Sequence, residues 1–351
     1  MAALSHAKPD RVPRYEIFFK SFADNWRRAK QLPPEADIAA YYQIDILRLN
    51  AVQQGPFLSK VIPEQKHGSD YVSRDSWGRT RRRLPGSDSF EVISALINER
   101  KDLDSIKFDD PAADAYYGSI SGMHRSEDEG CTRVAGTMGL FQACTWLRGE
   151  IPFMMDLLCD EEFCRDLVSK LKDFVRVMGE QTAIRADTLN SAFWVYDDFS
   201  INTGPMVSPD IFERIFLEPY RSLLRYWKSI GIQHLILHHD VMTEKTYPII
   251  DMFLDAGITG IQGVYPTGGL SLADFKSRYG RRLAVIGGMC NTHTLPFGSK
   301  KEIEHEAAAI VEVARDGGVI IGSHSIEGYI PVENYDCYHN FIVKYGRFYD
   351  E

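Results

Sequence analysis

The stretch QHLILHHDVMTE, residues 233–244, joins a short apolar run to a group of side chains that bind metals or move protons. Residues 235–237 contain no polar side chain, which is typical of a parallel strand that is buried on both faces. The run ends at His238, His239 and Asp240. The stretch therefore predicts a buried strand whose C-terminal end opens on a functional site.

The same order of an apolar run, a polar tip and a segment of helical period recurs on both sides of this stretch. Strands are predicted at 191–198, 233–240, 258–265, 282–290 and 319–324. Helices are predicted at 208–231, 243–256, 271–280 and 299–318, and the C-terminal segment 331–346 follows the last strand. Ser208 is a natural N-cap for the first helix, and Gly231 is a natural stop.

Successive strand–helix units fit either a closed (β/α)8 barrel or an open, doubly wound sheet. The chain has no GxGxxG motif after a first strand and no GxxxxGK[ST] loop, so readings as a dinucleotide- or nucleotide-binding protein lose support. We therefore expect a single TIM-barrel domain over residues 1–351, with an N-terminal helical and loop extension. The clearest units lie in 131–351.

The N-terminal third of the chain has a weaker pattern. RVPRYE, residues 11–16, is a candidate first strand, and CTRVAGTM, residues 131–138, is another. Residues 28–110 are predicted to be mainly helical and looped. We expect residues 1–110 to be less regular than the rest.

Composition and charge narrow the classes of function. The chain has 351 residues, of which 44% are hydrophobic and 25% charged, as in ordinary globular proteins. A net charge of −9 argues against nucleic acid and anionic membrane as partners. No run of about 18 apolar residues and no signal-peptide core are seen. The six cysteines form no CxxC pair, so we expect a protein of the reducing cytoplasm.

Polar residues gather at the ends of the predicted strands, where ligands bind in both α/β architectures. His238 and Asp240 are two residues apart, so on an extended chain they point the same way, and His239 points the other way. A His-x-Asp pair with one further His or Cys makes an open zinc site, and His324 and Cys290 are the candidates for that third ligand. The other residues of the group are Tyr196, Asp197, Asp198, Gln262, Tyr265, Asn291 and Ser323.

Each of these residues also has a simpler interpretation. His238 and Asp240 can form a proton-relay pair without a metal. Cys290 can be a small buried side chain, and Asp197 with Asp198 can form a solvated turn or a helix start.

Several long stretches resemble the uroporphyrinogen decarboxylase superfamily, and within it the corrinoid-dependent methyltransferases. The resemblance is strongest from residue 131 onward. It rests on GLFQACTWLRGEIPFMMDLLCDEEFCRDLV, YDDFSINTGPMVSPDIFERIFLEPY, LHHDVMTEKTYPIIDMFLDAGITGIQGVYP, DFKSRYGRRLAVIGGMCNTHTLPFGSKKEIEHE and GGVIIGSHSIEGYIPVEN, in the family's order. It implies a (β/α)8 barrel with its site at the C-terminal mouth.

Two activities compete under this resemblance. True uroporphyrinogen decarboxylases need no metal and hold the substrate's carboxylates with an RQAGR-like motif. The corresponding region here, PDRVPRYEIFFKSF at residues 9–22, lacks that motif. The methyltransferases bind zinc through His-x-Cys and a later Cys. His238 matches their His, Asp240 replaces the first Cys, and aligning PVEN places His324 at the later Cys.

With His-x-Asp in place of His-x-Cys, the chain resembles the family members that demethylate methoxylated substrates or methylated amines. The resemblance implies Zn²⁺ as a Lewis acid on the donor heteroatom and a Co(I) corrinoid as methyl acceptor. Asp197 or Asp198 would protonate the leaving group or hold a substrate hydroxyl. Trp194, Tyr196 and Tyr265 would line the pocket, with Gln262 and Asn291 as further substrate contacts, and Cys290 would be a fourth ligand or a substrate contact.

The chain has no DxHxxG corrinoid-ligating motif. The resemblance therefore implies a separate corrinoid protein that docks at the barrel mouth, together with a small-molecule methyl donor. A homodimer is compatible with the sequence. The competing functions are a metal-free lyase of the decarboxylase type and a non-catalytic protein that binds a corrinoid or tetrapyrrole.

Overall fold

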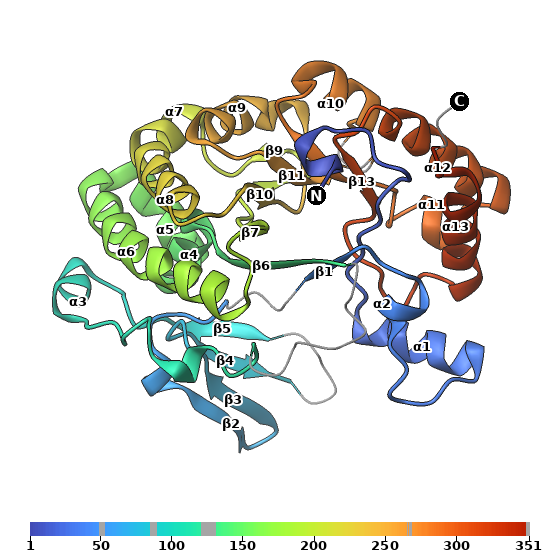
Figure 1. Cartoon of the computed structure of the whole chain (residues 1–351). Helices are drawn as coiled ribbons and strands as arrows, with labels where there is room; N and C mark the ends of the chain where they lie inside the picture. The colour runs from blue at the N-terminus through green and yellow to red at the C-terminus, as the bar shows by residue number, and fades with distance from the viewer. Residues whose placement is uncertain (49–52, 85–89, 121–130, 265, 267–268, 349–351) are drawn as a thin grey trace.

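The computed structural model describes residues 1–48, 53–84, 90–120, 131–264, 266 and 269–348 (Figure 1). Its centre is a parallel sheet of seven strands in the order β1-β6-β7-β10-β11-β12-β13. The strands are β1 (Ile46–Arg48), β6 (Thr132–Met138), β7 (Ala192–Tyr196), β10 (His234–His238), β11 (Gly260–Val264), β12 (Ala284–Gly288) and β13 (Val319–Gly322). Every neighbouring pair in this sheet is parallel.

The helices that follow these strands lie around the outside of the sheet in Figure 1. The α-helices are α1 (Lys20–Lys30), α2 (Ile38–Tyr41), α3 (Arg100–Ser105), α4 (Leu140–Arg148), α5 (Glu150–Cys159), α6 (Glu161–Arg185), α7 (Pro209–Phe212), α8 (Glu218–Ser229), α9 (Tyr247–Ala256), α10 (Leu272–Tyr279), α11 (Thr294–Phe297), α12 (Lys300–Ala314) and α13 (Val332–Tyr345). A π-helical turn, η5 (Glu213–Leu217), joins α7 to α8. Short 3-10 helices are η1 (Ala3–Ser5), η2 (Leu58–Lys60), η3 (Asp114–Tyr116) and η6 (Glu244–Thr246).

The sheet is curled, and the segment 11–16 bonds to both of its edge regions. On one side, Tyr15 N donates to Ile321 O of β13 at 3.0 Å, and Ile321 N donates to Pro13 O at 2.9 Å. On the other side, Asp45 N, just before β1, donates to Arg14 O at 3.0 Å. The architecture is therefore an α/β fold of the TIM-barrel kind, and the predicted first strand occurs as isolated bridges, parallel at Arg14 with Ile321 and antiparallel at Arg11 with Arg347.

The predicted strands and helices of the C-terminal half are confirmed. The central strands are mainly apolar because they are buried on both faces, and residues 235–237 are fully buried. Ser208 caps α7 by accepting a hydrogen bond from Ile211 N at 3.3 Å. Ser299 caps α12 in a reciprocal arrangement with Glu302. No helix in the described part of the chain is long and apolar enough to cross a membrane.

The prediction that residues 28–110 are mainly helical and looped is wrong. This region contains an antiparallel sheet of β2 (Ile62–His67), β3 (Asp70–Arg74), β4 (Thr80–Arg83) and β5 (Glu91–Ser94). Every residue of β2 and of β5 is exposed, and three of the four residues of β4 are arginines. Strands with so little buried surface do not need alternating apolar residues, so the pattern of hydrophobic residues did not indicate strands in this region. A further hairpin, β8 (Ser200–Ile201) with β9 (Gly204–Pro205), follows β7.

Candidate metal centre

A cavity of about 570 Å³ opens at the C-terminal ends of the strands of the central sheet. Its wall includes Tyr196, the last residue of β7, and His238, the last residue of β10. Asp240 and His324 come from the loops that follow β10 and β13. The predicted buried strand therefore ends in the wall of a cavity.

His238, Asp240 and His324 form a compact group in that wall. Each offers a ligand atom, and these atoms all lie within 4.8 Å of one another. Asp240 Oδ1 lies 3.5 Å from His238 Nε2 and 2.9 Å from His324 Nε2. The carboxylate thus stands between two imidazole nitrogens.

Gln262 fixes which nitrogen of His238 faces this group. Its Oε1 accepts the indole N–H of Trp194 at 2.7 Å, and an indole nitrogen can only donate. The same oxygen lies 3.0 Å from His238 Nδ1, so Nδ1 must carry the proton. The lone pair of neutral His238 is then on Nε2, which faces Asp240.

The charge on Asp240 is stabilised within the group. Burial raises the pKa of Asp240, but its interactions with the imidazoles of His238 and His324 outweigh that effect and hold this pKa well below its ordinary value. Asp198 lies beside it and accepts a hydrogen bond from Asp240 N at 3.0 Å. Burial, and then the negative charge of Asp240, raise the pKa of Asp198.

This donor set fits a zinc ion. Two imidazole nitrogens and one carboxylate are the three protein ligands of many open catalytic zinc sites. A buried partner that fixes the tautomer of a ligating histidine usually accompanies such sites, and Gln262 has that position here. The residues present are therefore able to hold zinc and leave room for a further ligand from the cavity.

Comparisons with known proteins agree with this architecture. A family model described as Uroporphyrinogen decarboxylase (URO-D) matches residues 88–345. The chain belongs to the URO-D family. No curated protein matches the chain. Among solved structures, a methyltransferase from Methanosarcina mazei is similar, with a TM-score of 0.68 and 15% sequence identity over 98% of this chain and 96% of that one. This likeness shows the fold.

In this URO-D family chain the two neighbouring acids, Asp197 and Asp198, have different surroundings. Asp198 lines the cavity. Asp197 is fully buried outside the cavity wall and accepts hydrogen bonds from Gln142 N at 2.8 Å and from the hydroxyl of Tyr220. Burial raises the pKa of Asp197 to about 7. We therefore retain Asp198 alone as a candidate for proton transfer.

Two predicted substrate contacts are also placed behind the wall. Trp194 is fully buried, and Gln262, also buried, is engaged with Trp194 and His238, so both support the site from within the sheet. Tyr196 and Asn291 do line the cavity. Tyr265 lies outside the described residues.

The two candidates for the third ligand are separated by the geometry. His324 belongs to the compact group with His238 and Asp240, and Cys290 does not. Cys290 is buried, its backbone N donates to Glu306 Oε1 at 2.6 Å, and its Sγ lies 3.6 Å from Thr292 Oγ1.

His239 points away from the cavity, as the alternation along an extended chain predicts. It is buried, and its ring stacks on that of Phe199 at 4.2 Å between centroids. Its Nε2 lies 2.7 Å from Ser200 Oγ, and burial lowers its pKa to about 4. The imidazole therefore stays neutral near pH 7, as a packed core residue.

Sequence reasoning missed two residues around the site. Arg48, at the end of β1, lines the cavity. The only signal in the sequence was the apolar pair at residues 46–47, which is followed directly by this cation. Glu16 is buried and accepts hydrogen bonds from Ser323 N at 3.0 Å and Ser323 Oγ at 2.7 Å. Glu16 thus anchors the residue that precedes His324.

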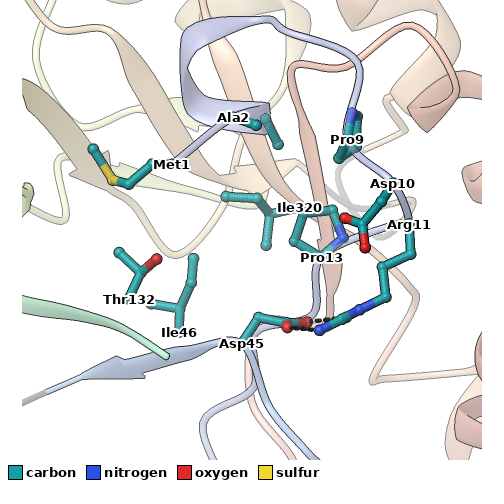
Figure 2. A pocket seen from close by; sticks show the side chains of 11 residues that line it. Met1, Ala2, Pro9, Asp10, Arg11, Pro13, Asp45, Ile46, Thr132 and Ile320 are labelled. Atoms are coloured by element: carbon teal, nitrogen blue, oxygen red, sulfur yellow. Dashed lines mark hydrogen bonds and ion pairs between the residues drawn. The ribbon is translucent and has the colours of Figure 1, made fainter. Parts of the chain in front are cut away.

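A second, smaller cavity of about 210 Å³ lies at the opposite ends of the strands (Figure 2). Ile46 and Thr132, which begin β1 and β6, line it. The charged pair in Figure 2 is Arg11 with Asp45, which are joined by a salt bridge. Because the group of His238, Asp240 and His324 lies at the other end of the sheet, we place the functional site there.

Proposed function

We propose that this URO-D family member is a zinc-dependent methyltransferase. It moves a methyl group from a small methoxylated or methylated donor to the Co(I) corrinoid of a separate protein. The observation that carries the proposal is the group of His238, Asp240 and His324, with ligand atoms within 4.8 Å of one another in the wall of a 570 Å³ cavity. The likeness in fold to a methyltransferase supports it.

His238, Asp240 and His324 would hold the metal, and Gln262 keeps Nε2 of His238 free for it. When bound, zinc supplies Lewis-acid polarisation of the donor's heteroatom, and the corrinoid supplies the nucleophile that accepts the methyl group. Asp198 is the residue placed to give a proton to the leaving atom, because it lines the cavity next to Asp240.

The remaining parts of the proposal concern the wall and the partner. Tyr196 and Asn291 are placed to contact the donor, since both line the cavity. A cavity of this volume suits a small molecule. We take the curled sheet as a single (β/α)8 barrel and propose that the corrinoid protein docks over its C-terminal mouth.

A second candidate is a metal-free decarboxylase. It is favoured by the family to which the chain belongs and by Arg48, a cation suited to binding a substrate carboxylate. Against it stand the three carboxylates in the same wall, Asp198, Asp240 and Glu327, which oppose a substrate with many negative charges. The methyltransferase accounts for the group of His238, Asp240 and His324, and the decarboxylase does not.

The test combines metal content and activity. Purified protein is analysed for zinc and is then mixed with Co(I) cobalamin and a panel of methoxylated aromatics and methylamines. Formation of methylcobalamin is followed by absorbance, with the variant His238→Ala alongside. We expect stoichiometric zinc and methyl transfer in the wild type, and the loss of both in His238→Ala. A wild type without zinc, or a fully active variant, would contradict the proposal, and metal-free turnover of a carboxylated tetrapyrrole would support the decarboxylase.

A further inference from the structure

The cavity wall contains one guanidinium group among the residues that the structure describes, that of Arg48. Arg48 ends β1, and its guanidinium lies over the ring of Tyr196, with Cζ 5.6 Å from the ring centroid. Its Nη1 donates to the Tyr196 hydroxyl at 3.3 Å. The other N–H groups of Arg48 have no partner in the described part of the chain.

Two other arginines with little exposed surface, in contrast, each have a carboxylate partner. Arg79 lies 2.7 Å from Asp75, and Arg148 lies 2.7 Å from Asp156. Arg48 has no carboxylate within ion-pair distance among the described residues. Withdrawing a cation from water without a counter-ion is unfavourable, and a tyrosine ring offsets that cost only in part. An arginine left in this condition in a cavity wall is suited to a ligand anion.

The ring of Tyr196 contacts both Arg48 and His238, a residue of the candidate metal centre. The centroid of the ring is 5.0 Å from the centroid of the His238 ring and 5.6 Å from Cζ of Arg48. Arg48 and His238 therefore contact the same aromatic ring, and all three residues line the cavity. A small molecule can span the two points.

We propose that Arg48 binds a carboxylate of the methyl donor, so that the substrate class is small methoxylated or N-methylated carboxylic acids. This inference rests on the proposed function. The carboxylates of Asp198, Asp240 and Glu327 line the same cavity and repel an anion, so they favour one orientation of the donor. Its carboxylate lies at Arg48, and its methylated heteroatom lies at His238, Asp240 and His324. Arginine recognises carboxylates through two parallel N–H···O bonds, which fixes that orientation.

The test is direct binding, measured by calorimetry on the full-length protein with and without added zinc. The probes are the three methoxybenzoate isomers and dimethylglycine, each paired with its primary amide, which has nearly the same shape but lacks the carboxylate charge. The variants are Arg48→Gln and, as a matched control, Arg225→Gln, which removes an exposed arginine of α8. The metal-free measurement excludes direct binding of the carboxylate to zinc as the source of the preference.

We expect at least one carboxylate to bind the wild type about tenfold or more tightly than its amide, with and without zinc. Arg48→Gln should abolish that preference by weakening the acid and sparing the amide, and Arg225→Gln should retain it. The inference is overturned if no acid binds, if acid and amide bind equally, or if Arg48→Gln keeps the preference. A carboxylate preference that appears only with zinc would also overturn it, because the metal would then be the anion's partner.

The same samples separate this inference from the proposed function. If acids bind through Arg48 but no methylcobalamin forms from any of them, the methyltransferase fails and the carboxylate site stands. If methyl transfer from neutral donors is fast and no acid binds in preference to its amide, the methyltransferase stands and the carboxylate site fails.

Discussion

Gln262 Oε1 accepts a hydrogen bond of 3.0 Å from Nδ1 of His238, and the same oxygen accepts the indole N–H of Trp194. This shared oxygen determines the tautomer of His238 without any charged group. Most of the candidate metal centre lies on loops, but its best-oriented imidazole is held from within the sheet, by neighbouring strands β7, β10 and β11.

The variant Gln262→Met should therefore bind zinc more weakly while keeping the shape of the side chain. We expect a loss of about 10–100-fold in zinc affinity, because partners that orient a ligating histidine have effects of this size. Affinity is measured by competition with a chromogenic chelator. Gln65→Met, a change on the exposed strand β2, is the control. Equal zinc affinity in both variants would show that the Gln262 bond does not matter for the metal.

The third ligand is tested by comparing His324→Ala with Cys290→Ser. His324 lies in the compact group and Cys290 does not, so we expect the first variant to lose stoichiometric zinc and the second to retain it. Zinc is measured by atomic emission after gel filtration, and circular dichroism checks that both variants fold. Zinc loss in Cys290→Ser, with zinc retained in His324→Ala, would reverse the assignment.

Asp198 should be needed for turnover and not for metal binding. In Asp198→Asn the amide oxygen can still accept the hydrogen bond from Asp240 N, but the side chain can no longer give up a proton. We expect methyl transfer to fall by about 10²–10⁴-fold with zinc content unchanged, as for the loss of a general acid. Rates are compared in single-turnover mixtures with Co(I) cobalamin. Wild-type rates in the variant would remove Asp198 from the reaction.

Asp197 should matter for stability instead. Its carboxylate accepts bonds from Tyr220 and from the start of α4, so Tyr220→Phe leaves a buried oxygen without its hydroxyl partner. The expected loss is about 1–3 kcal/mol in the free energy of unfolding. It is measured by urea titration, with the turnover of the folded fraction within a few-fold of the wild type. A large loss of turnover at unchanged stability would instead indicate a direct role for this pair in the reaction.

Glu16 should make stability depend on pH. Burial raises its pKa from 4.5 to about 7, against the opposing effect of the bonds from Ser323. Because the folded pKa lies above the unfolded one, the contribution is fully present below about pH 4.5 and declines as pH rises toward 7. The slope is at most about 1.4 kcal/mol per pH unit. Urea titrations from pH 4.5 to 8 should show this slope in the wild type and a smaller one in Glu16→Gln.

The matched control for that series is Glu35→Gln, which changes an exposed carboxylate. It should keep the wild-type slope. The same slope in Glu16→Gln and in the wild type would mean that the buried carboxyl group is not the source of the pH dependence.

The sequence predicted the C-terminal half of the fold well because its strands are short, mainly apolar and separated by capped helices. Residues 235–237 are buried on both faces, and a run of that kind has few other interpretations. The sheet of β2 to β5 was missed for the opposite reason. Its strands are mostly exposed, so they contain many polar residues, some of which form ion pairs such as that of Arg83 with Glu64.

For the site, the sequence could show which residues stand at strand ends but not which way each one faces. Two adjacent residues can have entirely different surroundings. Asp198 lines the cavity, whereas Asp197 is buried and accepts a hydrogen bond from Tyr220. Gln262 was expected to contact substrate and instead lies behind His238, since its role depends on Trp194 of another strand. Contacts between side chains of different strands depend on how the strands are aligned in the sheet, and this alignment cannot be read from a single sequence.

The bridging of β13 to residues 11–16 has a consequence for how the protein is made. Residue 321 bonds to residues 13 and 15, and Glu16 anchors Ser323 beside His324. These contacts join parts of the chain that are far apart in sequence, since Glu16 and Ser323 are separated by 307 positions. Pairings of such long sequence separation form slowly, because a large loop must close first. The candidate metal centre would therefore be assembled last, and zinc uptake during refolding would report the moment at which the sheet's two ends meet.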